Sequence, residues 1–338
     1  MKIVVSDPVG FEDEHVAWIR EAAEGDTLVF PKDDDELVVE LIDAEVFFGL
    51  HSPEIFAGAD NLKWIQTTSA GLDTMLTPEV VAMGLQVTNA SGLHAPPVVE
   101  TAWALTLAVS RCLRHFGKCQ DEHVWDQFVP WDLNGRTAGV IGLGGIGRRY
   151  AKIASAFGMR VIAVDLHSPP KPDEVEELWG LDRLNDLCAE ADVVMIACPA
   201  THETQGLIGA EQLVLMKSTA ILVNIARGGI VDEPALIKCL NEGRIIGAGL
   251  DVTKIEPLPE DDPLWDTPRL VITPHIAGWS NDRSCNVVKF FCENLSRYKA
   301  GEPLQNLVDQ ERGYPVPGYE LRSACKPDRS PTGDAPSP

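Results

Sequence analysis

The sequence predicts an α/β protein built around two parallel β-sheets, and three observations support this fold class. Short apolar segments rich in β-branched residues alternate with segments of helical periodicity, as they do in βαβ units. Several of the apolar segments contain no polar position, which is typical of parallel strands covered by helices on both faces. The chain has 338 residues, more than one compact core usually spans, so we expect two domains.

The first sheet is predicted from the N-terminal part of the chain. Its strand candidates are KIVVS, TLVF, EVFFGL, LKWIQTT and QVTN. The apolar stretch at the N-terminus is too short for a secretory signal and is interpreted as the first strand. A loop with two prolines, at Pro96 and Pro97, then opens a long helix that is apolar almost all round. Such a helix must be buried on more than one side, so we expect it at a domain junction or a subunit interface.

The second sheet is predicted from the middle of the chain. Its strand candidates are TAGVIG, RVIAVD, VVMIAC, AILVNI, GAGLD and LVITP. A further long helix, ended by Gly301 and Pro303, would carry the chain back toward the first domain. We therefore expect one domain from residues 1–98 plus 282–310 and another from 99–281. Residues 311–338, rich in proline, serine and charge, are predicted to be a disordered tail.

The net charge of −23 is the most unusual feature of the composition. It argues against nucleic-acid binding, because phosphate would be repelled, and it means that any site for an acid needs local positive charge. The excess fits either adaptation to high salt or an ordinary acidic surface. No apolar run reaches the roughly 18 residues of a membrane-spanning helix. We therefore expect no membrane partner and a cytoplasmic location.

The eight cysteines indicate buried thiols. They form no CxxC pair, and none has metal-ligand spacing with a histidine. Most lie inside apolar periodic segments, where a free cysteine behaves as a small hydrophobic residue. We expect no metal site.

A GxGxxG motif at Gly142, Gly144 and Gly147 predicts a dinucleotide site because of its context. It follows a predicted strand, opens a predicted helix, and is followed about 20 residues after Gly144 by Asp165 at the end of another strand. Gly142 would allow a tight turn, Gly144 would let backbone N–H groups approach a pyrophosphate, and Gly147 would pack helix against strand. The helix N-terminus adds partial positive charge for the phosphates.

Asp165 favours NAD over NADP. Its carboxylate can accept hydrogen bonds from both ribose hydroxyls and would repel a 2′-phosphate. His167 and Ser168 could soften that repulsion, but no arginine is adjacent to Asp165.

Three further polar segments follow predicted strands, where open α/β sheets bind their ligands. They carry Arg227, then Asp251 and Glu256, and then His275 in TPHIAGW. A lone histidine after an apolar strand is more often a packing residue, but the combination indicates chemistry on a 2-keto acid. A histidinium can protonate the alkoxide that hydride transfer creates, a neighbouring carboxylate favours the charged imidazole, and an arginine can bind the substrate carboxylate.

The segments GLGGIG, NIARGGIVDEPAL, GAGLDV, EPLP and TPHIAG resemble the NAD-dependent D-isomer-specific 2-hydroxyacid dehydrogenase family. The similarity extends over nearly the whole chain. It implies two Rossmann-like domains: a substrate (catalytic) domain split between the chain ends and a central NAD-binding domain. It also implies an active site in the cleft between them and a homodimer, with the helix after Pro97 as an interface element.

The resemblance assigns roles to individual residues. Arg227, Glu256 and His275 would be catalytic. Ala70 and Gly71 would bind the substrate carboxylate, and Arg227 and His275 would also contact the substrate. Cofactor contacts beyond the glycine motif would come from Gly145, Ile146, Asp165, Pro199, Thr204, Ala226 and Asp251.

The chain departs from the family pattern at three positions. Thr253 replaces a common phenylalanine, and Lys254 adds a cation near Glu256. Trp279 stands where smaller residues are frequent, so it either narrows the substrate pocket or packs at the hinge. His94 is a further candidate for the cleft.

We therefore expect an NAD-dependent reductase of small 2-keto acids, similar to the D-2-hydroxyacid dehydrogenases and glyoxylate or hydroxypyruvate reductases. Two alternatives remain open: an NADH-sensing, co-repressor-like protein on the same scaffold, and a phosphoglycerate dehydrogenase. Formate dehydrogenases of this architecture pair the histidine with glutamine, so Glu256 counts against that reaction.

Overall fold

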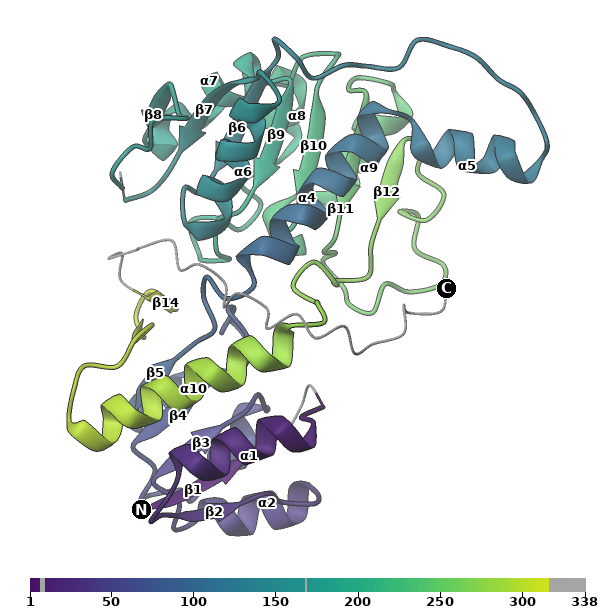
Figure 1. Ribbon diagram of the computed structural model, residues 1–338. Helices are drawn as coiled ribbons and strands as arrows, with labels where there is room; N and C mark the ends of the chain where they lie inside the picture. Colours follow the sequence, from purple (N-terminus) through teal and green to yellow (C-terminus); the bar gives the residue numbers. More distant parts are fainter. Residues whose placement is uncertain (7–9, 168, 316–338) are drawn as a thin grey trace.

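The computed structural model describes residues 1–6, 10–167 and 169–315. Two separate parallel sheets form the centres of two bodies, and two long helices connect these bodies (Figure 1). This arrangement confirms the predicted α/β fold class. No helix in the described segments combines the length and the apolar character that crossing a membrane requires.

The smaller body contains a five-stranded sheet with the order β2-β1-β3-β4-β5 and parallel pairing throughout. Its central strands are fully buried, in line with their apolar sequences. The strands are β1 (Lys2–Val5), β2 (Thr27–Val29), β3 (Val46–Phe48), β4 (Trp64–Gln66) and β5 (Gln86–Thr88). The helices are α1 (Asp13–Ala22), α2 (Asp34–Leu41), the 3-10 turn η1 (Pro53–Phe56) and α3 (Pro78–Ala82).

The larger body contains a seven-stranded parallel sheet with the order β12-β11-β10-β9-β6-β7-β8. The strand order reverses between β6 and β9, and ligands of open α/β sheets bind at such a switch point. The strands are β6 (Thr137–Ile141), β7 (Arg160–Val164), β8 (Glu177–Trp179), β9 (Val193–Ile196), β10 (Ile221–Asn224), β11 (Gly247–Leu250) and β12 (Leu270–Ile272). The helical elements are α6 (Gly145–Ala156), η2 (Leu181–Arg183), α7 (Leu184–Glu190), α8 (Ala210–Leu215), η3 (Gly228–Ile230) and α9 (Glu233–Asn241).

Two long helices link the bodies (Figure 1). Helix α4 (Ala95–Ser110) leaves the smaller body and packs on α6, β10 and β11, which buries most of its apolar surface within the chain. Helix α10 (Arg283–Ala300) returns to the smaller body and packs against α1. Phe291 of α10 stacks on Phe48, with ring centroids 4.1 Å apart. These contacts place α10 in the same body as the N-terminal strands.

Two segments lie outside the packed sheets. Helix α5 (Leu113–Asp121) and the loop after it extend away from the larger body (Figure 1). Strands β13 (Val308–Asp309) and β14 (Tyr314–Pro315) form a short antiparallel pair beside β5. Residues 311–315, which the sequence assigned to the tail, are therefore part of this pair, whereas 316–338 lie outside the described residues.

Candidate active site

A cavity of about 1710 Å³ lies between the two bodies and receives residues from both. Small-ligand sites usually enclose roughly 300–1,000 Å³, so this cavity has room for a dinucleotide beside a small acid. The sequence-predicted residues that line it are Ala70, Gly71, Gly144, Gly145, Ile146, Pro199, Ala226, Arg227, Asp251, Glu256 and His275. Gly142, Gly147, Asp165 and Thr204 are not among the residues that line the cavity.

The glycine motif forms a tight turn with an accessible backbone. Gly142 has φ +92°, and a Cβ there would lie 2.7 Å from the backbone nitrogen of Cys198. A Cβ on Gly147 would lie 2.0 Å from the carbonyl oxygen of Gly142. In contrast, Cβ atoms on Gly144 and Gly145 would meet open space at the N-terminus of α6. The backbone N–H groups there are free to approach a pyrophosphate, so this turn fits a dinucleotide.

Asp165 ties the end of β7 to the glycine turn. One carboxylate oxygen accepts a hydrogen bond from the Leu143 backbone N–H at 2.7 Å, and the other accepts one from the His167 N–H at 2.8 Å. These bonds fix the carboxylate beside the glycine turn, and each oxygen keeps a lone pair for a further hydrogen bond.

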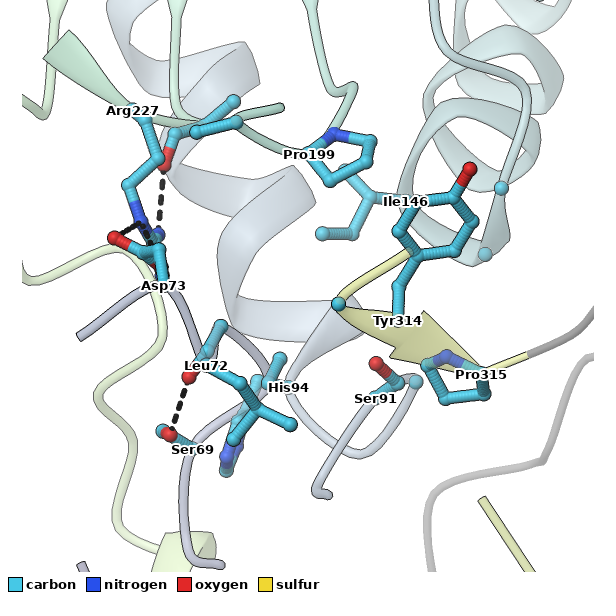
Figure 2. A pocket seen from close by; sticks show the side chains of 18 of the residues that line it. Ser69, Leu72, Asp73, Ser91, His94, Ile146, Pro199, Arg227, Tyr314 and Pro315 are labelled. Atoms are coloured by element: carbon cyan, nitrogen blue, oxygen red, sulfur yellow. Dashed lines mark hydrogen bonds and ion pairs between the residues drawn. The ribbon is translucent and has the colours of Figure 1, made fainter. Parts of the chain in front are cut away.

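Tyr314 is a cavity residue that the sequence analysis missed. It lines the same cavity as Ile146 and Pro199 (Figure 2), and its hydroxyl contacts Nε2 of His167. Burial, together with the nearby charge of Asp165, raises the pKa of Tyr314. Its composition-biased segment carries no motif, so no signal in the sequence pointed to it.

Thr204 shapes the loop that carries Pro199. Its hydroxyl donates to the Pro199 carbonyl at 2.7 Å and accepts from the Thr201 N–H at 2.8 Å. The side chain is buried. Its role in this structure is therefore to hold the loop, while Pro199 and Thr201 line the cavity.

His275 and Glu256 form a direct pair. Nδ1 of His275 lies 2.6 Å from Oε2 of Glu256, and the other carboxylate oxygen accepts from the Thr253 N–H at 2.9 Å. A carboxylate at Nδ1 fixes the ring orientation and leaves Nε2 available to another partner. The Lys254 N–H donates instead to Glu233, at 2.6 Å. Burial raises the pKa of Glu233.

The buried carboxylate of Asp251 holds the backbone around His275. Its oxygens accept from the Thr273 hydroxyl at 2.5 Å and from the N–H groups of Ile276 at 3.1 Å and Ala277 at 3.0 Å. The carbonyl of Asp251 accepts from the His275 N–H at 2.7 Å. His275 has φ +53°, a left-handed conformation that needs such support in a residue other than glycine.

Arg227 spans the cleft. Its Nε and Nη2 donate to Oδ1 of Asp73 in the smaller body at 3.1 and 3.0 Å, and Nη1 donates to the Ala226 carbonyl at 2.9 Å (Figure 2). Burial acts to raise the pKa of Asp73, but the hydrogen bonds and charge of Arg227 outweigh it and lower the pKa. Asn224 shapes the turn, accepting from the Ala226 N–H and donating to the Arg227 carbonyl. The sequence analysis missed both Asp73 and Asn224.

The guanidinium of Arg227 lies directly over Gly71. A Cβ at Gly71 would lie 1.5 Å from Nη2 of Arg227, so a side chain there would displace the guanidinium from its position. Side chains hold the neighbouring carbonyls: Ser69 donates to the Gly71 oxygen at 2.8 Å and Asn89 to the Ala70 oxygen at 2.6 Å. The predicted carboxylate loop and the predicted arginine therefore meet.

His94 and Trp279 also line the cavity. Nε2 of His94 lies 3.2 Å from the Thr68 carbonyl oxygen, and burial lowers the pKa of His94 to about 4. His94 is therefore neutral near pH 7. Trp279 is 68% exposed, so it forms the rim of the cavity and does not pack as a core residue.

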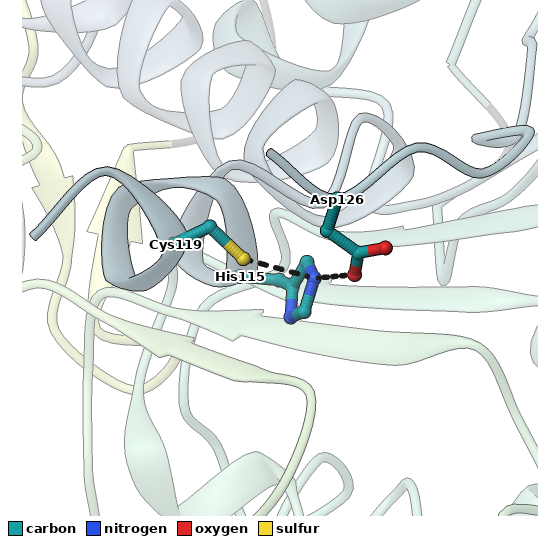
Figure 3. Close-up of side chains that lie close together, drawn as sticks. All are labelled: His115, Cys119 and Asp126. Atoms are coloured by element: carbon teal, nitrogen blue, oxygen red, sulfur yellow. Dashed lines mark hydrogen bonds and ion pairs between the residues drawn. The ribbon is translucent and has the colours of Figure 1, made fainter. Parts of the chain in front are cut away.

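One cluster of potential metal ligands lies away from this cavity, on α5 and the following loop (Figure 3). Nε2 of His115 lies 3.3 Å from Sγ of Cys119 and 2.8 Å from a carboxylate oxygen of Asp126. His115 and Cys119 are four residues apart on one helix face, so the prediction that no cysteine has metal-ligand spacing with a histidine was wrong for this pair. All seven cysteines in the described part of the chain are free.

Comparison with known proteins identifies the family of this fold. The model of the D-isomer specific 2-hydroxyacid dehydrogenase NAD binding domain matches residues 103–277. A glyoxylate reductase of Thermococcus onnurineus is 35% identical over 325 residues, covering 92% of each chain. A D-3-phosphoglycerate dehydrogenase of Methanocaldococcus jannaschii is 33% identical over 318 residues, covering 91% of this chain and 59% of that protein.

A solved structure shows the same overall architecture. It is a D-isomer specific 2-hydroxyacid dehydrogenase from Xanthobacter autotrophicus in complex with NADPH and MES. The TM-score is 0.78 at 29% sequence identity, and the match covers 93% of this chain and 99% of that chain.

The glycine turn yields a matched pair of substitutions. We expect Gly147→Ala to lower the free energy of unfolding by about 1–3 kcal/mol, because its Cβ would collide with the Gly142 carbonyl. Gly144→Ala places its Cβ in open space, so stability should change by less than about 0.5 kcal/mol while dinucleotide affinity falls. Urea denaturation and calorimetric NADH titration measure the two effects. Equal stability of the two variants would contradict this account of the turn.

Proposed function

The chain belongs to the D-isomer-specific 2-hydroxyacid dehydrogenase family of oxidoreductases acting on CH–OH donors, and we propose that it reduces small 2-keto acids with NADH. The observation that carries this proposal is the 2.6 Å pair of His275 and Glu256 in the cavity that also holds Arg227 and the glycine turn. The names of the relatives, a glyoxylate reductase and a phosphoglycerate dehydrogenase, agree with this substrate class.

Each residue has a separate task in this mechanism. The bound nicotinamide supplies or accepts the hydride. Arg227 has two N–H groups left after its contacts with Asp73 and Ala226, and these bind the substrate carboxylate beside the Gly71 loop. His275 gives a proton from Nε2 to the substrate oxygen during reduction and takes it back during oxidation. Glu256 stabilises the imidazolium and fixes the ring.

NAD is the proposed dinucleotide because of Asp165. A 2′-phosphate placed where the ribose hydroxyls meet this carboxylate would be repelled. The NADPH complex of the Xanthobacter autotrophicus relative shows that a protein of this fold also binds NADPH. The local charge at the ribose site therefore decides between the two cofactors.

The proposed assembly is a cytoplasmic homodimer. The free thiols of the described cysteines fit a reducing compartment. Helix α4 buries most of its apolar surface inside its own chain, so we assign the interface to α5 and the loop after it. Trp125 and Val129 in that loop are 90% and 95% exposed. Apolar surface of this extent usually marks a contact with another protein.

The first prediction concerns the proton donor. We expect His275→Gln to lower kcat for a 2-keto acid by about 10²–10⁴-fold and to leave NADH affinity nearly unchanged, because proton transfer is lost but the dinucleotide site is not. NADH oxidation with glyoxylate, hydroxypyruvate and pyruvate measures this effect. Near-normal kcat in the variant would identify a different acid. Intact NADH binding without turnover of any acid would favour the NADH-sensing alternative.

The second prediction concerns the dinucleotide. kcat/KM should be at least about tenfold higher with NADH than with NADPH, which corresponds to about 1.4 kcal/mol of discrimination. Asp165→Ser should reduce this ratio, because the repelling carboxylate is gone. Comparable kcat/KM values for both cofactors in the unmodified protein would refute the assignment of NAD.

The third prediction concerns assembly. Val129→Asp should convert the dimer to a monomer, because it places a charge in an apolar interface. Light scattering after gel filtration measures the mass of each variant. Val39→Asp is the control, since Val39 is also exposed but lies on α2. A dimer that survives Val129→Asp and Trp125→Asp would place the interface elsewhere.

A further inference from the structure

Arg283, the first residue of α10, lies at the active-site cavity and has no acidic partner within the part of the chain that the structure describes. It lines the cavity together with Arg227 and His275. Its Nε is buried without a hydrogen-bond partner, and none of the ion pairs among the described residues includes Arg283. Unpaired arginine is unexpected here, because the chain has 51 acidic and only 28 basic side chains. With so many acidic residues in the chain, an acidic partner for this arginine would be expected.

Arg283 is partly buried, so its guanidinium loses contacts with water, and no carboxylate among the described residues takes their place. Burial lowers the pKa of Arg283, and no carboxylate opposes this effect. Burying part of a guanidinium without a hydrogen-bonded anion costs free energy, whereas an ordinary buried arginine recovers that cost from a carboxylate. A guanidinium still stays charged near neutral pH. This position therefore offers a positive charge and N–H donors that the protein itself does not use.

The neighbours of Arg283 form one wall of the cavity. The guanidinium carbon lies 5.6 Å from the ring centroid of Trp279, within cation–π range, so the indole limits where the side chain can point. Burial, and to a smaller extent the charge of Arg283, lowers the pKa of His94 to about 4. His94 is therefore neutral near pH 7, and the positive charge on this wall comes from Arg283.

Arg227 differs from Arg283 because it has an acidic partner. Asp73 already compensates its charge at 3.0 Å, and its remaining donors are assigned to the carboxylate next to the keto group. A second, uncompensated arginine in the same cavity is redundant for an acid with a single anionic group. It has a use if the substrate carries another anion at its far end.

We propose that Arg283 forms a second anion subsite, so that the preferred substrate is a 2-keto acid with an anionic group, a carboxylate or a phosphate, on its side chain. This inference rests on the proposed 2-keto acid reductase function. Arg227 holds the first carboxylate, Arg283 binds the distal anion, and Trp279 keeps the guanidinium in place. Charge-assisted hydrogen bonds of this kind contribute about 1.5–3 kcal/mol, or roughly 10–150-fold in kcat/KM.

The experiment compares acids of matched chain length. Oxaloacetate is set against 2-oxobutyrate and 2-oxoglutarate against 2-oxopentanoate, and 3-phosphohydroxypyruvate against hydroxypyruvate separates phosphate from carboxylate. We expect at least one anionic acid to exceed its neutral partner about tenfold or more in kcat/KM. Arg283→Gln should lower kcat/KM for that acid about 10–100-fold and change the neutral partner by less than about threefold. Arg111→Gln, remote from the cavity, is the control.

Two results would overturn the subsite. One is a wild-type protein that prefers neutral side chains throughout; the other is an Arg283→Gln variant that loses both members of a pair equally, as a merely structural arginine would. Calorimetric titration with D-malate without cofactor gives a readout independent of turnover. Affinity should fall about tenfold or more in Arg283→Gln, and unchanged affinity would also reject the subsite. Absence of turnover with every acid would reject the proposed function, while the D-malate titration would still decide on Arg283.

Discussion

The buried carboxylate of Asp251 is the group on which the geometry of the candidate active site depends. With 1% of its surface exposed, it accepts hydrogen bonds from the turn that follows β12, and its own carbonyl binds the His275 N–H. A buried carboxylate is tolerated only when its oxygens are satisfied, so it holds the turn in one conformation. The left-handed backbone of His275 follows from that constraint, and so does the 2.6 Å contact with Glu256. The pairing of His275 with Glu256 is thus a product of strand ends that hydrogen bonds hold together.

Two glycines of the cleft allow neighbouring segments to approach each other closely. Gly147 lets α6 reach the turn after β6, and Gly71 lets Arg227 lie across the loop of the other body. The space that a Cβ would occupy is taken by the Gly142 carbonyl at Gly147 and by the guanidinium of Arg227 at Gly71. Gly144 differs, because the space beside it is open. One residue type therefore serves packing at two positions and ligand access at a third.

Local patterns in the sequence predicted much of this protein, because βαβ units are encoded by short-range periodicity and turn chemistry. The glycine spacing predicted the turn after β6, and the apolar runs predicted the strands of both sheets. The edge strand β8 (Glu177–Trp179) was missed, since three residues with a partly polar pattern give little signal. Asp73 and Tyr314 were missed for another reason. Their contacts, with Arg227 and His167, join segments far apart in the chain, and no motif encodes such pairings.

The electrostatics of the cleft reconcile an acidic protein with an acidic substrate. A net charge of −23 repels anions at long range, but screening by salt limits that repulsion to about 8–10 Å at moderate ionic strength. Inside the cavity, the charges of nearby side chains determine whether an anion is attracted or repelled. Asp73 already balances the charge of Arg227 at 3.0 Å. Among the ion pairs of the described residues none includes Arg283, although Arg148, Arg149, Arg297 and Arg312 also line the cavity. The proposed preference for a doubly charged acid therefore depends on the uncompensated charge of Arg283 beside Trp279, because the charge of Arg227 is already balanced by a carboxylate of the protein itself.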